Sequence, residues 1–365
     1  MDPDPHPASP HQPLQAEIVG PQRAAFAARP SRPLRAVLTI LLVAIVVPAV
    51  ILALAVGGLL LANAFLLGGS RDLQSRVQEK YFSHNPSARQ KIAILSVEGV
   101  IIEGEGFIRQ QIERASKDDD VKAVVLRVDS PGGTITGSDF IHHHLRRLSD
   151  ETNKPLVVSM GSLAASGGYY VSMAVGDTPG SIFAEPTTWT GSIGVIIPLF
   201  QASELMQKLG IEENSVVSHP LKDMGSFSKP LTEEERVIFQ QLVDESFERF
   251  KKVVRSGRPE LGKDADALDK LATGQVFTAD QALEAGLIDE IGFIEKAIDR
   301  AIELAGLSPG EVRVVKYKPE PTLADVLLGG GMKSHALDLS AILDLGTPRA
   351  YYLWTRIPPL VRSSR

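Results

Sequence analysis

Small residues surround Ser166, and their types and spacing could do chemistry. The stretch from Val157 to Tyr170 reads VVSMGSLAASGGYY, which predicts a strand, a tight turn and then the start of a helix. A serine hydroxyl at such a turn lies beside the free amides of a helix N-terminus, a place that suits a nucleophile and an oxyanion. The same residues would also suit an ordinary turn in which two backbones approach closely.

A second glycine turn ends a neighbouring predicted strand. Asp129-Ser130-Pro131-Gly132-Gly133 follows the apolar run from Val121 to Val128. In open parallel sheets, ligands bind beyond the carboxyl ends of the strands, so both turns are expected at one edge. Gly132 and Gly133 can present backbone amides with no side chain in the way. Taken alone, this segment would equally fit an ordinary turn.

A serine nucleophile needs a base, and the histidines do not offer one in a recognisable triad context. His142, His143 and His144 are consecutive in a predicted helix, so they point in different directions; we expect a solvated helix face rather than a metal site. The absence of cysteine excludes a thiolate nucleophile, disulfides and Cys-ligated zinc. A lysine whose pKa is lowered by burial or nearby positive charge can serve as the base. Lys222 is the candidate, although its own context would also fit a solvated surface lysine.

Four motifs together carry a resemblance to a known family. They occur in the order SPGG at 130–133, MGSLAASGGYY at 160–170, TGSIGV at 190–195 and KDMGS at 222–226. With a preceding apolar segment, they resemble the signal peptide peptidase A family in its short bacterial form. These are membrane-anchored serine proteases with a Ser–Lys dyad, distantly similar in fold to Clp protease and crotonase. The resemblance covers about residues 90–305.

The resemblance implies a role for each matching residue. It makes Ser166 the nucleophile, Lys222 the general base and Ser192 the hydroxyl that orients the lysine amine. The amides of Gly133 and Gly167 would form the oxyanion hole, with Gly132 beside it. The expected reaction is attack of Ser166 on a peptide carbonyl, proton transfer through neutral Lys222 and hydrolysis of the acyl-enzyme.

The segment around Lys222 departs from the family pattern. His219-Pro220-Leu221 precedes the lysine, where the family more often has a Gly-Pro-aromatic turn. The spacing from Ser166 is also a few residues longer. Lys208 and Lys229 are therefore rivals for the base, and the KDMGS motif favours Lys222.

The order of predicted elements gives the fold class. Strands alternate with helices, which predicts an α/β fold with a parallel sheet and flanking helices, of the Clp/crotonase type by resemblance. The expected strands are 91–102, 121–128, 155–160, 181–185, 194–198 and 311–317. The expected helices are 107–116, 135–148, one from Ser166, 232–255 and two within 277–306.

The chain divides by composition into five parts. We expect a disordered Pro-rich tail at 1–35, a transmembrane signal anchor at 36–70, a polar linker at 71–90, the catalytic domain at 91–318 and a C-terminal tail at 319–365. The tail holds Gly329-Gly330-Gly331 and the aromatic run Tyr351-Tyr352-Leu353-Trp354; docking on the domain, lipid contact and disorder are all open for it.

The apolar segment is long enough to cross a membrane. Residues 36–70 contain no charged residue, and about 20 residues suffice to span the hydrocarbon core. A cleavable signal peptide is the alternative, because Ala62-Asn63-Ala64 resembles a cleavage site, but its apolar region is usually only about 7–15 residues. We expect an uncleaved, single-pass anchor in the bacterial inner membrane with the catalytic domain outside the cytoplasm, although the flanking charges indicate this orientation only weakly.

The expected partners follow from charge and from the resemblance. A net charge of −6 makes nucleic acid an unsuitable partner, and no cofactor or metal is expected. The family implies hydrophobic peptides, specifically remnant signal peptides, as substrates and a ring-like homo-oligomer with active sites near subunit interfaces. Met160, Ile193, Val195 and Ile196 could line an apolar groove or belong to the core.

Three other functions are compatible with parts of this pattern. A crotonase-like acyl-CoA enzyme shares the backbone oxyanion chemistry but needs no Ser–Lys pair. A membrane serine protease of the stomatin-clipping type has similar glycine and serine motifs. An inactive scaffold that binds peptides would keep the fold without the chemistry. Reaction with acylating probes and substrate profiling separate these functions.

Overall fold

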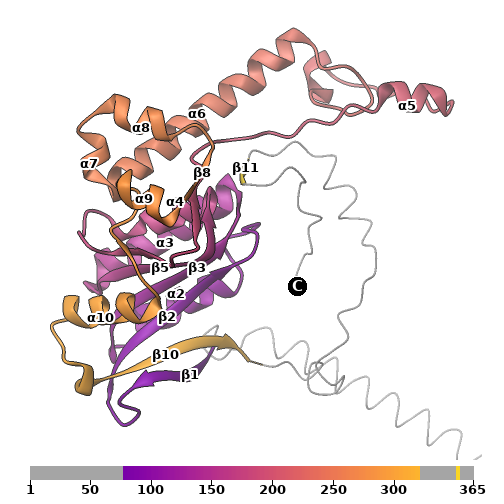
Figure 1. The fold of residues 1–365 in the computed structure, drawn as a ribbon. Helices are drawn as coiled ribbons and strands as arrows, with labels where there is room; N and C mark the ends of the chain where they lie inside the picture. Colours follow the sequence, from indigo (N-terminus) through magenta and orange to yellow (C-terminus); the bar gives the residue numbers. More distant parts are fainter. Residues whose placement is uncertain (1–76, 321–350, 354–365) are drawn as a thin grey trace, which may run out of the picture. The chain divides into compact units, whose positions relative to one another are not determined.

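The computed structural model describes residues 77–320 and 351–353, drawn in colour in Figure 1. The predicted N-terminal tail and membrane anchor lie outside these residues, as does most of the predicted C-terminal tail. Among the helices that the structure describes, none combines the length and apolar character that a bilayer crossing requires. The anchor at 36–70 therefore stays a prediction.

A mixed, mostly parallel sheet forms the centre of the described domain. Its main strand order is β1-β10-β2-β3-β5-β6-β9, with β7 continuing beside β5 and β8 beside β7. The β1–β10 and β7–β8 pairs are antiparallel and the other pairs of this sheet are parallel. The bounds are β1 Val77–His84, β2 Gln90–Glu98, β3 Val121–Ser130, β5 Leu156–Ala165, β6 Ile182–Ala184, β7 Trp189–Gly191, β8 Val276–Thr278, β9 Glu290–Ile291 and β10 Val312–Pro319. This arrangement confirms the predicted α/β class.

A second, two-stranded sheet joins β4 (Gly132–Thr134) to β11 (Tyr351–Leu353). The helices are α2 Phe107–Lys117, α3 Ile135–Thr152, α4 Gly167–Ser172, α5 Ser203–Lys208, α6 Glu233–Gly257, α7 Pro259–Gly262, α8 Ala265–Leu271, α9 Ala279–Glu284 and α10 Ile294–Leu304. A short 3-10 helix spans Pro220–Asp223. Each of the six predicted helices has a counterpart in the structure, although α3 continues to Thr152. The predicted strand at 194–198 is reduced to a single β-bridge of Ile196.

Both faces of the main sheet are apolar and buried. Successive strand residues point to opposite faces, so Ala93 and Leu95 of β2 pack with α3 on one face, and Ile92 and Ile94 pack on the other. Helix α10 covers that second face with Ala297, Ile298, Ala301 and Ile302. The near-continuous apolar runs of β2 and β3 follow from this double coverage, which is typical of parallel sheets.

Strand β1 lies inside the segment that we expected to be a linker. It pairs antiparallel with β10 at the edge of the sheet, from Val77 opposite Pro319 to His84 opposite Arg313. Its charged sequence, VQEKYFSH, has little apolar alternation because most of it faces solvent. This segment is a strand because it pairs with β10, and local sequence does not predict a pairing between segments so far apart in the chain.

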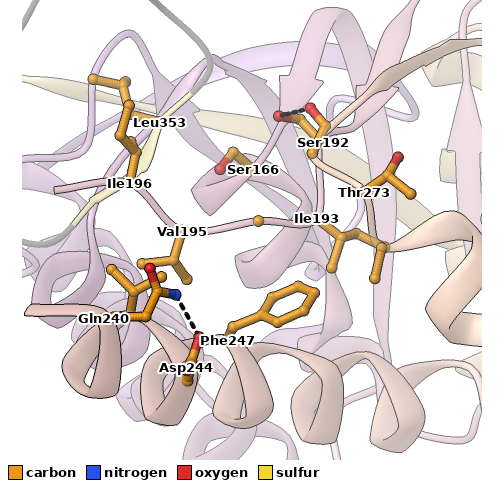
Figure 2. Close-up of a pocket in the computed structure, with 14 residues that line it drawn as sticks. Ser166, Ser192, Ile193, Val195, Ile196, Gln240, Asp244, Phe247, Thr273 and Leu353 are labelled. Carbon is orange, nitrogen blue, oxygen red and sulfur yellow. Dashed lines mark hydrogen bonds between the residues drawn. The ribbon is translucent and has the colours of Figure 1, made fainter. Parts of the chain in front are cut away.

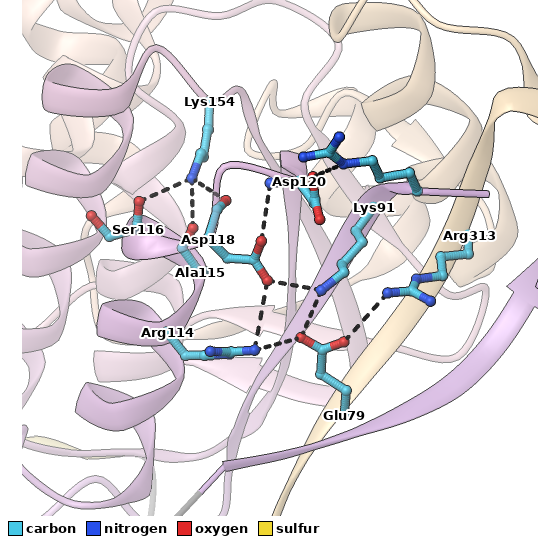
Figure 3. Close-up of polar contacts among 10 residues, drawn as sticks. Glu79, Lys91, Arg114, Ala115, Ser116, Asp118, Asp120, Lys154 and Arg313 are labelled. Atoms are coloured by element: carbon cyan, nitrogen blue, oxygen red, sulfur yellow. Dashed lines mark hydrogen bonds and ion pairs between the residues drawn. The ribbon is translucent and has the colours of Figure 1, made fainter. Parts of the chain in front are cut away.

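An ion-pair cluster ties β1 to the neighbouring elements (Figure 3). Lys91 Nζ lies 3.0 Å from Glu79 Oε1 on β1 and 2.8 Å from Asp118 Oδ2, and Arg114 of α2 lies 3.3 Å from the same Glu79 oxygen. Desolvation raises the pKa of Asp118, but hydrogen bonds from Lys91 and from the Asp120 amide outweigh it, so that the net pKa is lowered. Because Lys91 is buried, removing either acid would leave its charge poorly compensated.

Candidate active site

Ser166 lies at a strained turn between β5 and α4. Its φ of 55° and ψ of −113° are unusual for a residue with a side chain, and such strain is found where surrounding structure enforces it. The Ser166 amide donates to the Gly191 carbonyl of β7 at 2.8 Å, and the Ser166 carbonyl accepts from the Tyr170 amide at 2.8 Å. The residue is only 1% exposed, yet it lines a cleft, so its position is fixed and its hydroxyl faces a space where a ligand fits.

Gly132 and Gly133 of β4 lie directly beside this turn. A methyl group on Gly132 would lie 2.5 Å from the Gly167 amide nitrogen, and one on Gly167 would lie 3.1 Å from the Gly133 amide nitrogen. A methyl group on Gly133 would collide with the Ile101 carbonyl, whose strand-like segment runs alongside. The structure therefore brings the three glycines together with Ser166, and the close approach leaves no room for side chains.

Ser192 follows β7 and faces the same cleft as Ser166 (Figure 2). Its φ is 51°, its amide donates to the Gln275 carbonyl at 2.7 Å, and its Oγ donates to the Gly274 carbonyl at 3.1 Å. A hydroxyl that donates one hydrogen bond keeps two lone pairs as acceptors. Ser192 can thus accept a hydrogen bond from an amine that enters the cleft.

The cleft is about 900 Å³ and is mostly apolar. Its lining residues are Ser166, Ser192, Ile193, Gly194, Val195, Ile196, Gln240, Val243, Asp244, Phe247, Ala272, Thr273, Gly274 and Leu353. Three of the residues expected to line an apolar groove do so, whereas Met160 lies fully buried in the core. Figure 2 shows Phe247 and Asp244 reaching the cleft from α6, a contribution that the sequence motifs did not indicate. Aliphatic peptide side chains fit such a lining.

Lys222 lies apart from the other predicted site residues. It sits in the 3-10 helix Pro220–Asp223, is exposed, and does not line the cleft that holds Ser166. Its rival Lys229 lies 2.6 Å from Asp223 and 2.8 Å from Glu235, and hydrogen bonds to these two carboxylates raise the Lys229 pKa. A raised pKa disfavours the neutral amine that a base requires. Lys208 ends α5 in the same exposed segment.

The segment that carries Lys222 is held by its own contacts. Ala202 donates to the Phe227 carbonyl at 2.7 Å, and Ser226 Oγ lies 3.3 Å from Glu213. Figure 1 shows this stretch, with α5, leading away from the sheet before the chain returns into α6. We name residues 199–231 the arm. The described part of the chain therefore holds Ser166, Ser192 and the three glycines in one place and Lys222 in another.

The C-terminal strand β11 was missed by the sequence analysis. It pairs antiparallel with β4, placing Tyr352 opposite Gly133 and Leu353 opposite Gly132. Tyr351 also exchanges two backbone hydrogen bonds with Ile196, at 3.0 and 2.9 Å. The aromatic run was visible in the sequence, but no local pattern says where a three-residue strand docks.

The histidine triplet on α3 does not gather into one site. His142 is half-buried against Tyr170, His143 is exposed, and His144 packs on Phe140. Burial, together with nearby positive charges, outweighs Asp139 and lowers the pKa of His142 to about 4. Within the described residues, no cluster of His, Asp and Glu has the arrangement of a metal site.

The chain is similar to known peptidases. Residues 149–308 match peptidase family S49. The chain is 37% identical over 247 residues to the "Putative protease slr0021" of Synechocystis, which covers 67% of this chain and 85% of that protein. It is 35% identical over 292 residues to the "Putative signal peptide peptidase SppA" of Enterococcus faecium, covering 73% of this chain and 82% of that protein. It is 38% identical over 224 residues to protease 4 of Haemophilus influenzae, covering 59% of this chain and only 35% of that longer protein.

Proposed function

Since this chain belongs to peptidase family S49 and is a serine peptidase, we propose that Ser166 and Lys222 form its catalytic dyad and that it degrades remnant signal peptides beside a membrane. The observation that carries the proposal is the convergence of Ser166 with the Gly133 and Gly167 amides at a strained strand-to-helix turn. An acyl-transfer enzyme needs a nucleophile and backbone donors in that relation.

The reaction follows from these groups. Ser166 Oγ attacks the peptide carbonyl carbon while the neutral Lys222 amine takes the hydroxyl proton. The Gly133 and Gly167 amides hold the negative oxygen; one such donor is worth about 3–4 kcal/mol of barrier stabilisation. Lys222 then protonates the leaving amine, and water releases the acyl group through the same steps in reverse. Ser192 accepts a hydrogen bond from the lysine and fixes its amine.

The separation of Lys222 from Ser166 supports a homo-oligomer in which the lysine comes from a neighbouring copy. The arm presents exposed apolar side chains, among them Phe200 and Leu209, the latter 64% exposed. Large exposed apolar side chains gathered in one segment are typical of protein contacts. When the arm of one copy docks on the next, both features are explained. The apolar arm is covered, and the lysine reaches a cleft that has no lysine of its own among the described residues.

The substrate proposal is supported by the cleft and by the sequence. Ile193, Val195 and Phe247 give it an apolar lining, which suits the hydrophobic core of a signal peptide. The uncharged segment 36–70 is long enough to anchor the chain in a bacterial inner membrane, next to the place where such peptides are left. The name of the Enterococcus relative agrees with this substrate class.

The test of the dyad uses the full chain purified in detergent. A fluorophosphonate probe should label the wild-type protein and the Lys208→Met control, and should fail to label Ser166→Ala. Lys222→Met should lower the hydrolysis of a fluorogenic apolar peptide by about 10²–10⁴-fold, the contribution typical of a general base. Labelling of Ser166→Ala at the same site would contradict the nucleophile, and normal hydrolysis by Lys222→Met would contradict the base.

The test of the substrate class compares three peptides on the same enzyme. A released signal peptide should be cleaved, and the same segment within its intact preprotein should be spared. An apolar stomatin-type C-terminal segment serves as the competing substrate. Faster cleavage of that segment would replace signal peptides as the proposed substrates without affecting the dyad.

A further inference from the structure

We propose that Asp129 is a positioning residue of this peptidase, which holds a bulge in β5 and thereby brings Ser166 beside the segment that carries Ser192. This inference rests on the proposed function of Ser166. It goes further because it gives a part in the reaction to a carboxylate that lies outside the cleft.

Strand β5 contains a bulge just before the Ser166 turn. The register of β3 and β5 shifts by two residues between two successive pairs, which are Val128 with Met160 and Ser130 with Ala164. Between these pairs β3 has only Asp129, whereas β5 has residues 161–163. A bulge bends its strand and re-aims the side chains that follow it, and bulges are over-represented next to active sites.

The bulge changes the partner of β5. Before it, residues 158–160 pair with β6; after it, residues 163–165 pair with β7. The Ser166 amide continues the second pairing by donating to the Gly191 carbonyl at 2.8 Å, and Ser192 is the next residue of that segment. The bulge therefore directs the nucleophile toward the segment that supplies the second hydroxyl of the cleft.

The Asp129 carboxylate holds the bulge through one oxygen. Its Oδ1 accepts from the Ser162 hydroxyl at 2.8 Å and from the Leu163 amide at 3.1 Å. We call these two bonds the clamp. The extra residues of a bulge interrupt the ladder of backbone hydrogen bonds, so their amides need acceptors from elsewhere. Both bonds require an acceptor and neither requires a negative charge, so an amide oxygen can replace the carboxylate.

Other contacts fix the beginning of the bulge. Thr188 Oγ1 donates to the Gly161 carbonyl at 2.6 Å, and Arg127 Nη1 donates to Ser159 Oγ at 2.9 Å just before it. A methyl group on Gly161 would lie 3.1 Å from the carboxyl carbon of Asp129, which shows how closely the two strands approach here. These side chains hold the first half of the bulge, and Asp129 holds the second half.

Loss of the clamp should affect the chemical step more than substrate binding. Neither Asp129 nor Ser162 lines the cleft, so the surface that contacts a substrate is kept. A displacement of Ser166 from the Gly133 and Gly167 amides, by contrast, disturbs the geometry of attack, and misplacement by about 1 Å can cost about 10²-fold in rate. The expected signature is a fall in kcat at nearly constant KM.

Steady-state kinetics of the full chain in detergent test the clamp. For a fluorogenic apolar peptide, Asp129→Ala should lower kcat about 10–100-fold and change KM by less than about 3-fold. Asp129→Asn keeps the acceptor oxygen, so its kcat should stay within about 3-fold of the wild-type value. Ser162→Ala is the milder change, because it removes one of the two bonds, and its kcat should lie between those of the two Asp129 variants.

Asp289 offers a matched control, because its carboxylate holds backbone amides at another strand. Its Oδ2 accepts from the Ser181 and Ile182 amides at 2.9 Å, and its Oδ1 pairs with Arg258. Asp289→Ala should lower the unfolding midpoint at least as much as Asp129→Ala does, while kcat is retained. An unchanged kcat in Asp129→Ala, equal losses in Asp129→Ala and Asp129→Asn, or an equal loss in Asp289→Ala well below its unfolding midpoint would overturn the proposal.

Hydrogen exchange measures the clamp without relying on catalysis. In the Ser166→Ala background, the Leu163 amide should exchange at least about 10-fold faster when Asp129→Ala is added, because it loses its acceptor, and should be unchanged when Asp129→Asn is added. Unchanged exchange of Leu163 in Asp129→Ala would overturn the proposal. Faster exchange, together with no hydrolysis by the chain that keeps Ser166, would uphold the clamp and contradict the proposed function.

Discussion

Two serines with left-handed backbone conformations define the site at the scale of residues. Ser166 and Ser192 have φ values of 55° and 51°, although neither is glycine. Such conformations cost of order 1–3 kcal/mol each and persist only where neighbours enforce them. The Gly191 carbonyl enforces the first and the Gln275 carbonyl the second. Glycine would relieve this strain but would remove both hydroxyls, so the residue types themselves indicate chemistry.

The first residue-scale prediction concerns Gly167. A methyl group at Gly167 would collide with Ser138 Oγ and lie 3.1 Å from the Gly133 amide, so Gly167→Ala should shift an oxyanion donor. We expect kcat/KM for a peptide to fall about 10²–10³-fold, the loss typical of one donor. Adding Ser138→Ala removes part of the collision and should restore some activity. An unchanged kcat/KM in Gly167→Ala would place the oxyanion elsewhere.

The second residue-scale prediction concerns pH and His142. The folded-state pKa of about 4 lies below the usual 6.5, so the folded chain disfavours the protonated form. Stability is therefore full above pH 6.5 and is lost as pH falls from 6.5 toward 4, by about 2 kcal/mol at pH 5. The free energy of unfolding in urea should fall between pH 7.5 and pH 5 in the wild type. In His142→Leu this fall should be smaller by about that amount. The exposed His143→Leu is the control, and equal pH dependence in both variants would contradict this prediction.

Helix α6 connects the site to the arm at the scale of elements. Its N-terminus carries a capping box, in which Thr232 Oγ1 accepts from the Glu235 amide and Glu235 accepts from the Thr232 amide. The buried Glu235 also pairs with Lys229. Further along, the same helix lines the cleft through Gln240 and Phe247 and offers the Ser246 carbonyl to Tyr352. One rigid element thus positions the turn of Lys222 and the wall of the cleft.

Lys229 provides the element-scale prediction. It bridges Asp223 and Glu235, which ties the turn of Lys222 to the start of α6. Lys229→Met should lower kcat/KM about 10-fold by loosening that turn, a smaller loss than Lys222→Met causes, because partial misplacement costs less than loss of the base. The exposed Lys208→Met is the matched control. If Lys229→Met abolished hydrolysis and Lys222→Met did not, Lys229 would be the base.

At the scale of the whole molecule, the described chain keeps the two residues of the proposed dyad apart. Ser166 lies in a cleft that lacks a lysine, and Lys222 lies on an arm with exposed apolar residues. A second copy that supplies the lysine would complete the chemistry and cover the arm. In symmetric assemblies the same contact repeats around the ring, so each copy would both give and receive a lysine.

Complementation provides the whole-molecule prediction. Ser166→Ala and Lys222→Met are each expected to be inactive. Co-refolding or co-expression of the two variants in equal amounts should restore about one quarter of wild-type activity. A site is active only when its serine and the facing lysine are both intact, and each is intact in half of the copies. Unmixed variants are the controls. An assembly that stayed inactive after confirmed subunit exchange would place both residues of the dyad in one chain.

Sequence alone predicted the α/β class and the two glycine turns, and it proposed Ser166 as the nucleophile, because these inferences depend on local patterns. Strand periodicity, breaker residues and four motifs in order lie within short windows of the chain, and they led to Ser166 and the glycines beside it. The segment around Lys222 was recognisable as a motif, but its position relative to Ser166 was not. The three-dimensional contacts show them apart.

Only the tertiary structure decided what meets across long separations. Strand β1 emerged from an expected linker because β10, more than 200 residues away, supplies its hydrogen bonds. The α6 wall of the cleft and the docking of Tyr352 on Gly133 join segments with no shared local signature. Local sequence fixes which conformations a segment prefers, whereas pairing between distant segments depends on the packed arrangement of the whole domain. The Ser166 turn could therefore be predicted from the sequence, whereas the pairing of β11 with β4 beside it could not.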